Sequence, residues 1–278
     1  MLTPLTPIVC VEQGAFDPYL DPELYDHEYR RRRHDVAWYR QLAQDSAQIH
    51  PEPILELGSG TGRLLLPLAR DGHRVIGIER SAAMLARCNQ RIRPHGQKVA
   101  SRIALVQGDF RDLPLATTEK LALILCPFNG FSHLYDRLDL ERFLSGIRGV
   151  LRRDGLFAFD VVHPDPAWLS KDSRRRWSRT RFRHPRTREP LIYSTNHDYL
   201  PAEQILLMRL YYEPDFSVPF SDRSAPATVV LTHRLYFPDE LVALLHYNGF
   251  SVWHRAGGFD GQALSPSSRE QVLCVRLR

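Results

Sequence analysis

The segment Ile54–Arg63 constrains this chain more than any other, because three glycines at alternate positions directly follow a short apolar run. An apolar run that stops at glycines and resumes as a helical pattern is typical of a strand, a tight turn and a helix. Gly58, Gly60 and Gly62 let the backbone turn sharply and let a ligand lie against the main chain. The segment therefore predicts a ligand-binding turn at the end of a strand.

Short apolar segments alternate with helical patterns over the next hundred residues. The predicted strands are Ile54–Leu57, Arg74–Ile78, Ile103–Gln107, Leu121–Cys126 and Leu156–Val162. Helices are expected over Pro22–Gln48, over Thr61–Arg70, after Ser81 and over Leu138–Leu151. This alternation predicts an α/β fold with a parallel, doubly wound sheet. Ligands of such sheets bind at the carboxyl ends of the strands.

The pattern changes after Pro164, where a polar, basic and proline-rich stretch runs to residue 190. Three later segments rich in β-branched and aromatic residues follow: Leu191–Tyr199, Gln204–Tyr212 and Thr228–Phe237. We expect them to be antiparallel strands added to the parallel sheet as a lid or substrate-facing insertion. A helix from Pro238 and two closing strands, Phe250–His254 and Gln271–Leu277, would complete the core.

The expected organisation has four parts. They are an N-terminal cap segment and helix (1–50), a ligand-binding core (51–163), a β insertion or lid (164–236) and a C-terminal completion of the core sheet (237–278). The composition, 43% hydrophobic and 25% charged over 278 residues, is that of a globular protein able to bury a core. No apolar run approaches the ~20 residues of a membrane span. With no secretory signal at the N-terminus, cytoplasm is the expected compartment.

Cysteine and arginine usage narrow the function classes. The four cysteines are scattered without a CxxC pair, so no metal site or disulfide framework is expected. The net charge is +5, and arginines cluster at Arg30–Arg33 and between Arg174 and Arg188. Such blocks attract acidic substrates or nucleic acid, or they form a solvated surface. We favour the solvated surface for the second block.

Carboxylates accompany the first three predicted strands. Glu56 lies two residues before Gly58, Glu79 closes the second strand, and Asp109 follows the third. The dinucleotide fingerprint is G-x-G-x-x-G with a pyrophosphate at the helix N-terminus, whereas here the pattern is E-x-G-x-G-x-G. This arrangement resembles motif I and the following motifs of class I S-adenosylmethionine (SAM) dependent methyltransferases.

The resemblance implies a Rossmann-like, seven-stranded sheet with an antiparallel β insertion after strand 5, and SAM as cofactor with S-adenosylhomocysteine (SAH) as product. It implies that Glu56 attracts the cationic groups of SAM and that Glu79 accepts the ribose hydroxyls. It also implies that Asp109 and the Phe110 backbone N–H bind the adenine. The other implied cofactor contacts are Tyr25, Tyr29, Arg32, Gly58, Ser59, Gly60, Gly62, Arg80 and Pro127.

The segment Cys126–Leu134, which follows the fourth strand, is where the methyl group and its acceptor should meet. It lacks the D/N-P-P-Y/F/W tetrapeptide of DNA and glutamine methyltransferases, and no metal-binding acidic pair is recognisable. It resembles small-molecule N- and O-methyltransferases, and His133 matches a histidine of sugar-amine N-methyltransferases. His163 follows the fifth strand. Either histidine could hold or deprotonate the acceptor near neutral pH, or be structural.

The predicted function is transfer of a methyl group from SAM to a nitrogen or oxygen of a small-molecule acceptor by in-line displacement, with nitrogen slightly favoured. An RNA or protein methyltransferase using the arginine-rich surface, a non-catalytic SAM-binding protein and a nicotinamide oxidoreductase are the alternatives. An acidic acceptor is one option, a nucleic-acid or membrane partner is not favoured, and the chain is expected to be a monomer or a homodimer.

Overall fold

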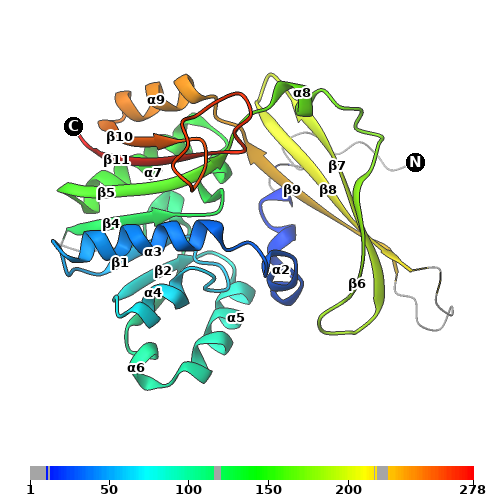
Figure 1. Ribbon diagram of the computed structural model, residues 1–278, viewed down its shortest axis with the longest axis horizontal. Coiled ribbons are helices and arrows are strands. Elements are labelled where there is room, and N and C mark those ends of the chain that lie inside the picture. Colours follow the sequence, from blue (N-terminus) through cyan, green and yellow to red (C-terminus); the bar gives the residue numbers. More distant parts are fainter. Residues whose placement is uncertain (1–10, 12, 116–119, 216, 218–224) are drawn as a thin grey trace. The chain divides into compact units, whose positions relative to one another are not determined.

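The computed structural model describes residues 11, 13–115, 120–215, 217 and 225–278 (Figure 1). The chain divides into two compact units. The insertion unit consists of Met1–Arg31 and Asp165–Arg234, and the core unit consists of Arg32–Pro164 and Leu235–Arg278. The first ten residues of the expected N-terminal segment lie outside the described residues.

The core unit is built on a seven-stranded sheet of order β10-β11-β5-β4-β1-β2-β3. Its strands are β1 (Ile54–Leu57), β2 (Val75–Glu79), β3 (Ile103–Gln107), β4 (Leu121–Cys126), β5 (Leu151–Val162), β10 (Phe250–Ala256) and β11 (Glu270–Leu277). Strands β1 to β5 pair in parallel, whereas β11 is antiparallel to both β5 and β10. The predicted Rossmann-like, doubly wound sheet is therefore confirmed. The strand order reverses between β1 and β4, so a ligand crevice is expected beyond their carboxyl ends.

Helices cover both faces of this sheet, which explains why all six residues of β4 are buried. The helices are α3 (His34–Ala47), α4 (Leu65–Asp71), α5 (Ala82–Ile92), α6 (Gln97–Ala100), α7 (Arg137–Val150) and α9 (Pro238–Tyr247). One apolar cluster joins α3, α4 and α5 to alternate strand residues such as Ile54 and Leu125. The other joins α7 and α9 to the intervening residues, such as Leu55 and Ile124. Glu56 points to the first of these faces because strand side chains alternate.

The insertion unit has its own four-stranded antiparallel sheet of order β6-β7-β8-β9. Its strands are β6 (Trp177–Arg183), β7 (Pro190–Leu200), β8 (Ile205–Pro214) and β9 (Ala227–Arg234), and its helices are α2 (Pro22–Tyr29) and α8 (Pro166–Leu169). One face packs around Leu191, Leu210, Tyr212 and Leu231, with Leu24 of α2 against them. The insertion was expected and is antiparallel. The expectation that its strands extend the parallel sheet is wrong, because β7, β8 and β9 pair antiparallel with one another in a separate sheet.

Several element boundaries also differ from the sequence expectations. The single helix expected from Pro22 to Gln48 is two helices, α2 and α3, separated by the arginines 30–33. Helix α4 begins at Leu65 rather than Thr61, because the turn that follows β1 extends through residue 64. Strand β5 begins at Leu151, which pairs with Leu121, so the predicted helix end at this point was one residue too late. Strand β6 was missed because its run of arginines lacks apolar alternation.

Helix lengths and hydropathy bear on membrane contact. Among the described residues, no helix is both long enough and apolar enough to cross a bilayer.

Candidate functional site

The turn after β1 has the backbone conformation that its glycines predict. Gly58, Gly60 and Gly62 have φ values of +67°, +55° and +77°, a region that side-chain-bearing residues rarely adopt. The N–H of Ser59 donates to a carbonyl of β2 at 3.0 Å, which fixes the turn against the neighbouring strand. A Cβ on Gly62 would lie 2.7 Å from Cys88 Sγ, so the third glycine is required by packing against α5.

Glu79 connects this turn to the start of α5. Its two carboxylate oxygens accept the backbone N–H groups of Gly60 at 3.0 Å and Ser81 at 2.7 Å. Burial raises the pKa of Glu79, and these two hydrogen bonds act in the opposite direction. The structure thus brings Glu79 and Gly60 together, and one carboxylate organises the ends of both β1 and β2.

Glu56 is a buried carboxylate at the end of β1 and is only 2% exposed. Burial raises its pKa to about 8; Arg63 opposes the shift, whereas Glu79 and Asp35 add to it. Arg63 makes two hydrogen bonds of 2.9 and 2.5 Å to Asp35, so its charge is shared. Within the described part of the chain, Oε2 of Glu56 has no hydrogen-bond partner. A buried polar atom without a partner is uncommon and marks a position where a ligand group fits.

Asp109 lies after β3, as expected, and its carboxylate is engaged by Arg111. The Arg111 guanidinium donates to Asp109 at distances down to 2.6 Å and to Asp139 of α7 at 2.9 Å. Burial opposes ionisation of Asp109, but the hydrogen bonds from Arg111 outweigh it and the pKa lies below its usual value. Arg80 approaches the same carboxylate at 3.8 Å.

The loop after β4 is strained, and it is anchored by a residue of β5 that sequence reasoning missed. Phe128 and Asn129 are consecutive non-glycine residues with φ near +60°. Their backbone N–H groups donate to the two oxygens of Asp160 at 2.7 and 3.1 Å. Asp160 is fully buried in β5 and also accepts the Tyr39 hydroxyl at 2.7 Å. Burial raises the pKa of Asp160, and the hydrogen bonds act against that rise.

Two guanidinium groups lie over the ring of Phe128. Arg32 and Arg63 lie 4.7 and 4.4 Å from its centroid, within the range of cation–π attraction. Arg32 also pairs with Glu270 of β11 at 3.2 Å. Of the three residues predicted in the N-terminal segment, Arg32 therefore reaches the loop after β4. Tyr25 and Tyr29 belong to α2 of the insertion unit, where their rings lie 4.8 Å apart.

The remaining predicted residues lie near the same strand ends. The Phe110 ring approaches Gly58, with 3.7 Å between its edge and the position of a Cβ there. The carbonyl of Pro127 accepts the N–H of Gly130 at 3.2 Å. His133 is the last residue of a 3₁₀ turn, Gly130–His133.

The two candidate histidines are held by different contacts. The Nδ1 atom of His133 lies 2.8 Å from the Tyr135 hydroxyl, which orients the ring. His163 follows β5, and its backbone N–H donates to the Arg269 carbonyl at 2.9 Å. Both follow strands whose carboxyl ends lie at the ligand edge of the sheet.

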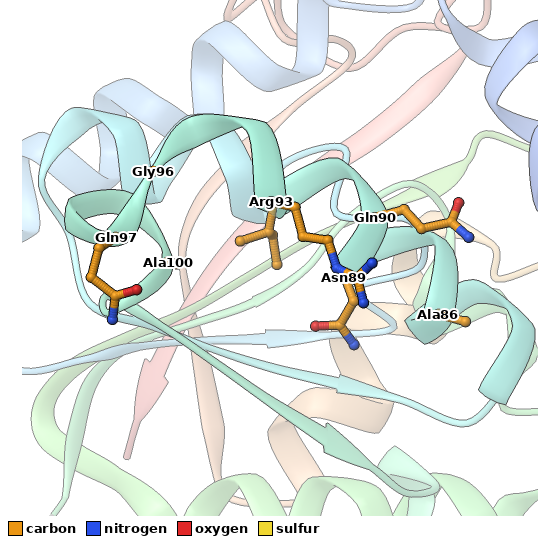
Figure 2. Close-up of a pocket in the computed structure, with 8 residues that line it drawn as sticks. Ala86, Asn89, Gln90, Arg93, Gly96, Gln97 and Ala100 are labelled. Carbon is orange, nitrogen blue, oxygen red and sulfur yellow. The ribbon is translucent and has the colours of Figure 1, made fainter.

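Other parts of the described chain are weaker candidates for a functional site. Cys88, Cys126 and Cys274 are buried, and no group of three or more His, Cys, Asp or Glu residues in these ranges could hold a metal ion. A cavity of about 660 Å³ lies on the surface of α5 and α6 and has walls of amide and guanidinium groups from Asn89, Gln90, Arg93 and Gln97 (Figure 2). None of the predicted site residues lines it.

Comparison with known proteins gives the family. The profile of a methyltransferase domain matches residues 54–155. An uncharacterized methyltransferase of Geobacillus kaustophilus is 30% identical over 163 residues, which cover 58% of this chain and 67% of that protein. One of Geobacillus thermodenitrificans is 28% identical over 218 residues, covering 77% of this chain and 90% of that protein.

Solved structures share the fold. The CcbJ methyltransferase of Streptomyces caelestis has a TM-score of 0.69 and 22% identity, over 86% of this chain and 88% of its own. CalS10, an amino pentose methyltransferase of Micromonospora echinaspora solved with SAM bound, has a TM-score of 0.63 and 16% identity, over 91% and 96%. The glycopeptide N-methyltransferase MtfA complexed with SAM has a TM-score of 0.58 and 19% identity, over 86% and 87%.

Proposed function

Because this chain belongs to the methyltransferase family, we propose that it transfers the methyl group of SAM to a nitrogen or oxygen atom of a small-molecule acceptor. The observation that carries the proposal is the set of carboxylates at three adjacent strand ends. Glu56 has a buried oxygen without a hydrogen-bond partner among the described residues, and Glu79 holds the glycine turn. Together with Asp109, they suit a ligand with cationic groups and hydroxyls, and they disfavour a pyrophosphate.

Each of these residues has a proposed role toward the cofactor. Glu79 accepts the ribose hydroxyls with the lone pairs that its backbone contacts leave available. Asp109 and the N–H of Phe110 bind the adenine. Glu56 balances the positive charge of the methionine portion. The other proposed contacts are Tyr25, Tyr29, Arg32, Gly58, Ser59, Gly60, Gly62, Arg80 and Pro127.

The proposed reaction is an in-line displacement. SAM, when bound, supplies a methyl group that its sulfonium already activates toward an acceptor lone pair. The protein mainly holds the two reactants in line and excludes water. Bringing the reactants into this geometry in advance removes a large part of the activation barrier. The rigid loop at Phe128 and Asn129, anchored by Asp160, would position the acceptor. His133 and His163 are the proposed groups that hold the acceptor or take its proton.

A small amine is the favoured acceptor. CalS10 acts on an amino pentose and MtfA is a glycopeptide N-methyltransferase, so this fold serves amine acceptors elsewhere. The arginine-rich stretch gives less support to an RNA substrate. Three of its arginines are paired within the insertion unit: Arg176 with Glu213, Arg181 with Asp215 and Arg186 with Asp21. Such pairing reduces the positive potential available to phosphates.

The test uses calorimetry and a transfer assay. The full chain should bind SAH and should not bind NADH. With methyl-labelled SAM, it should then label members of a panel of amino sugars and other small amines. Binding of NADH without binding of SAH would select an oxidoreductase and refute the proposal. SAH binding with no labelling of any small amine or alcohol, but labelling of RNA or protein, would reassign the substrate.

A further inference from the structure

A second site is suggested by a cavity that lies wholly within the insertion unit. Its volume is about 30 Å³, and it lies between α2 and the sheet. Tyr25, Glu28 and Tyr29 line it from α2, and Leu210, Tyr212 and Val229 line it from β8 and β9. A water needs roughly 10–15 Å³ of such volume, so the cavity has room for the end of a ligand rather than for a whole substrate.

Three carboxylates line this cavity, Asp17, Asp21 and Glu28, and of these Glu28 is the one that faces the sheet residue Tyr212. One carboxylate oxygen, Oε1, accepts the Tyr212 hydroxyl. No ion pair reaches Glu28 within the described ranges. Burial raises the pKa of Glu28, and the hydrogen bond from Tyr212 acts against that rise. A carboxylate taken out of water is normally paired with a cation or kept neutral.

Several carboxylates of the insertion unit are paired with its arginines. Four of its other carboxylates have an arginine partner: Asp21 with Arg186, Asp198 with Arg209, Glu213 with Arg176 and Asp215 with Arg181. Glu28 is further from water than a surface carboxylate, yet it is paired only with a hydroxyl. The cation that would complete it is therefore expected to come from a ligand.

The surrounding rings favour the same kind of ligand. The rings of Tyr25 and Tyr29 lie 4.8 Å apart on α2, and those of Tyr193 and Tyr212 lie 5.6 Å apart on the sheet. Tyrosine faces attract an organic cation in addition to the attraction of a carboxylate. The apolar side chains of Leu210 and Val229 exclude water, which strengthens an ion pair formed inside.

We propose that this cavity binds an ammonium group of the acceptor, with Glu28 as counter-ion and the ring of Tyr212, which is not among the proposed cofactor contacts, as a wall. The inference rests on the proposed methyltransferase function and gives the favoured amine acceptor a binding site. The oxygen of Glu28 that does not face Tyr212 accepts an N–H of the ammonium. The alternative is that Glu28 is simply a neutral acid held by Tyr212, with no ligand.

The test compares a cation with its neutral isostere. Cyclohexylamine and cyclohexanol are titrated into the full chain at pH 7, with and without saturating SAH, and binding is followed by ligand-observed NMR. The wild type should prefer the amine by about tenfold or more, as expected for a charge-assisted hydrogen bond. Glu28→Gln keeps the size and the Tyr212 contact but should remove the preference. Glu23→Gln, a matched charge change on the same helix outside the cavity, should retain it.

A second variant and the SAH measurements complete the test. Val229→Phe fills the cavity without changing charge, so it should abolish amine binding even if Glu28→Gln does not fold. An unchanged preference in either folded variant would overturn the proposal. A loss of SAH affinity in Glu28→Gln, with the amine preference intact, would assign Glu28 to cofactor binding. This result would also overturn the proposal. If the wild type fails to bind SAH but keeps the amine preference, the proposed function fails and this site does not.

Discussion

The Asp160 carboxylate accepts the backbone N–H of Phe128 at 2.7 Å, which ties the end of β5 to the loop after β4. The same carboxylate accepts the N–H of Asn129 and the hydroxyl of Tyr39. Two consecutive residues with positive φ are costly, at about 1–3 kcal/mol each, and persist only where the surroundings enforce them. Asp160 is the group that enforces them here.

The substitution Asp160→Asn should therefore destabilise the protein strongly. An amide in this position places an NH₂ group against donors, so at least one buried N–H loses its acceptor. We expect a loss of about 2–4 kcal/mol in the free energy of unfolding, measured by urea denaturation. Tyr39→Phe removes only one donor and should cost about 1 kcal/mol. Equal costs for the two variants would contradict the anchoring role of Asp160.

Replacing Gly60 tests whether ligand space or backbone strain dominates at the turn. A Cβ on Gly60 would lie 3.5 Å from Met84 Cε, an ordinary contact, so the protein itself has room for a small side chain. Gly60→Val should cost stability through its φ of +55° and should also abolish SAH binding, because the side chain would project into the proposed ligand space. Calorimetry measures the binding.

The control for strain is Gly72→Ala. Gly72 also has a positive φ, +110°, and a Cβ there would meet nothing within 4 Å. This variant should lose stability and keep the affinity for SAH. If Gly60→Val retained the wild-type affinity for SAH, the cofactor would have to bind elsewhere.

Glu79→Ala should weaken SAM binding at least tenfold. The change removes proposed hydrogen bonds to the ribose, each worth about 1.5–3 kcal/mol, and also releases the Gly60 and Ser81 N–H groups. Glu79→Gln retains one acceptor oxygen, so its affinity for SAM should lie between those of the wild type and Glu79→Ala. Calorimetric titration of all three proteins gives the ranking, and an unchanged affinity for Glu79→Ala would mean that another group holds the ribose.

Glu56 should make the ligand-free protein less stable as the pH rises. Its pKa is raised by burial from 4.5 to about 8, so between these values the folded state holds a proton that the unfolded chain has released. Its contribution therefore falls by up to about 1.4 kcal/mol per pH unit in that window. Denaturation of wild type and Glu56→Gln between pH 5 and 8.5 isolates the contribution of Glu56. Parallel curves of unfolding free energy against pH would refute the raised pKa of Glu56.

SAM binding should release a proton from Glu56 near pH 7. A cationic ligand favours the ionised carboxylate and so lowers its pKa. Calorimetry in buffers of different ionisation enthalpy should show this release in wild type and a smaller release in Glu56→Gln. The same proton count in both proteins would place the positive charge of the ligand away from Glu56.

The parallel core was predictable because its signals are local. Strands β3 and β4 have the predicted bounds, since each is a short apolar run between turn residues. The break between α2 and α3 was not predictable, because four consecutive arginines are good helix formers. Strand β6 was missed for a related reason: an edge strand of arginines exposes most of its side chains and shows no apolar alternation.

The positions of the candidate-site residues were predictable only where a motif names the residue. Glu56, Glu79 and Asp109 follow from strand ends and glycines, so the sequence placed them on one edge of the sheet. Asp160 lies within an apolar strand, and its only signal was a carboxylate where a buried side chain was expected. Its partners Phe128 and Tyr39 come from other elements, and such long-range pairs depend on strand register and helix packing.

A crystal structure of the full chain with SAH would show directly whether Glu56, Glu79 and Asp109 bind the cofactor. Ribose hydroxyls are expected within hydrogen-bond distance of Glu79, the adenine amine at Asp109, and the ligand amino group on the side of Glu56. A structure in which SAH occupies another place, such as the α5–α6 surface cavity of Figure 2, and touches none of these three carboxylates would contradict these expectations.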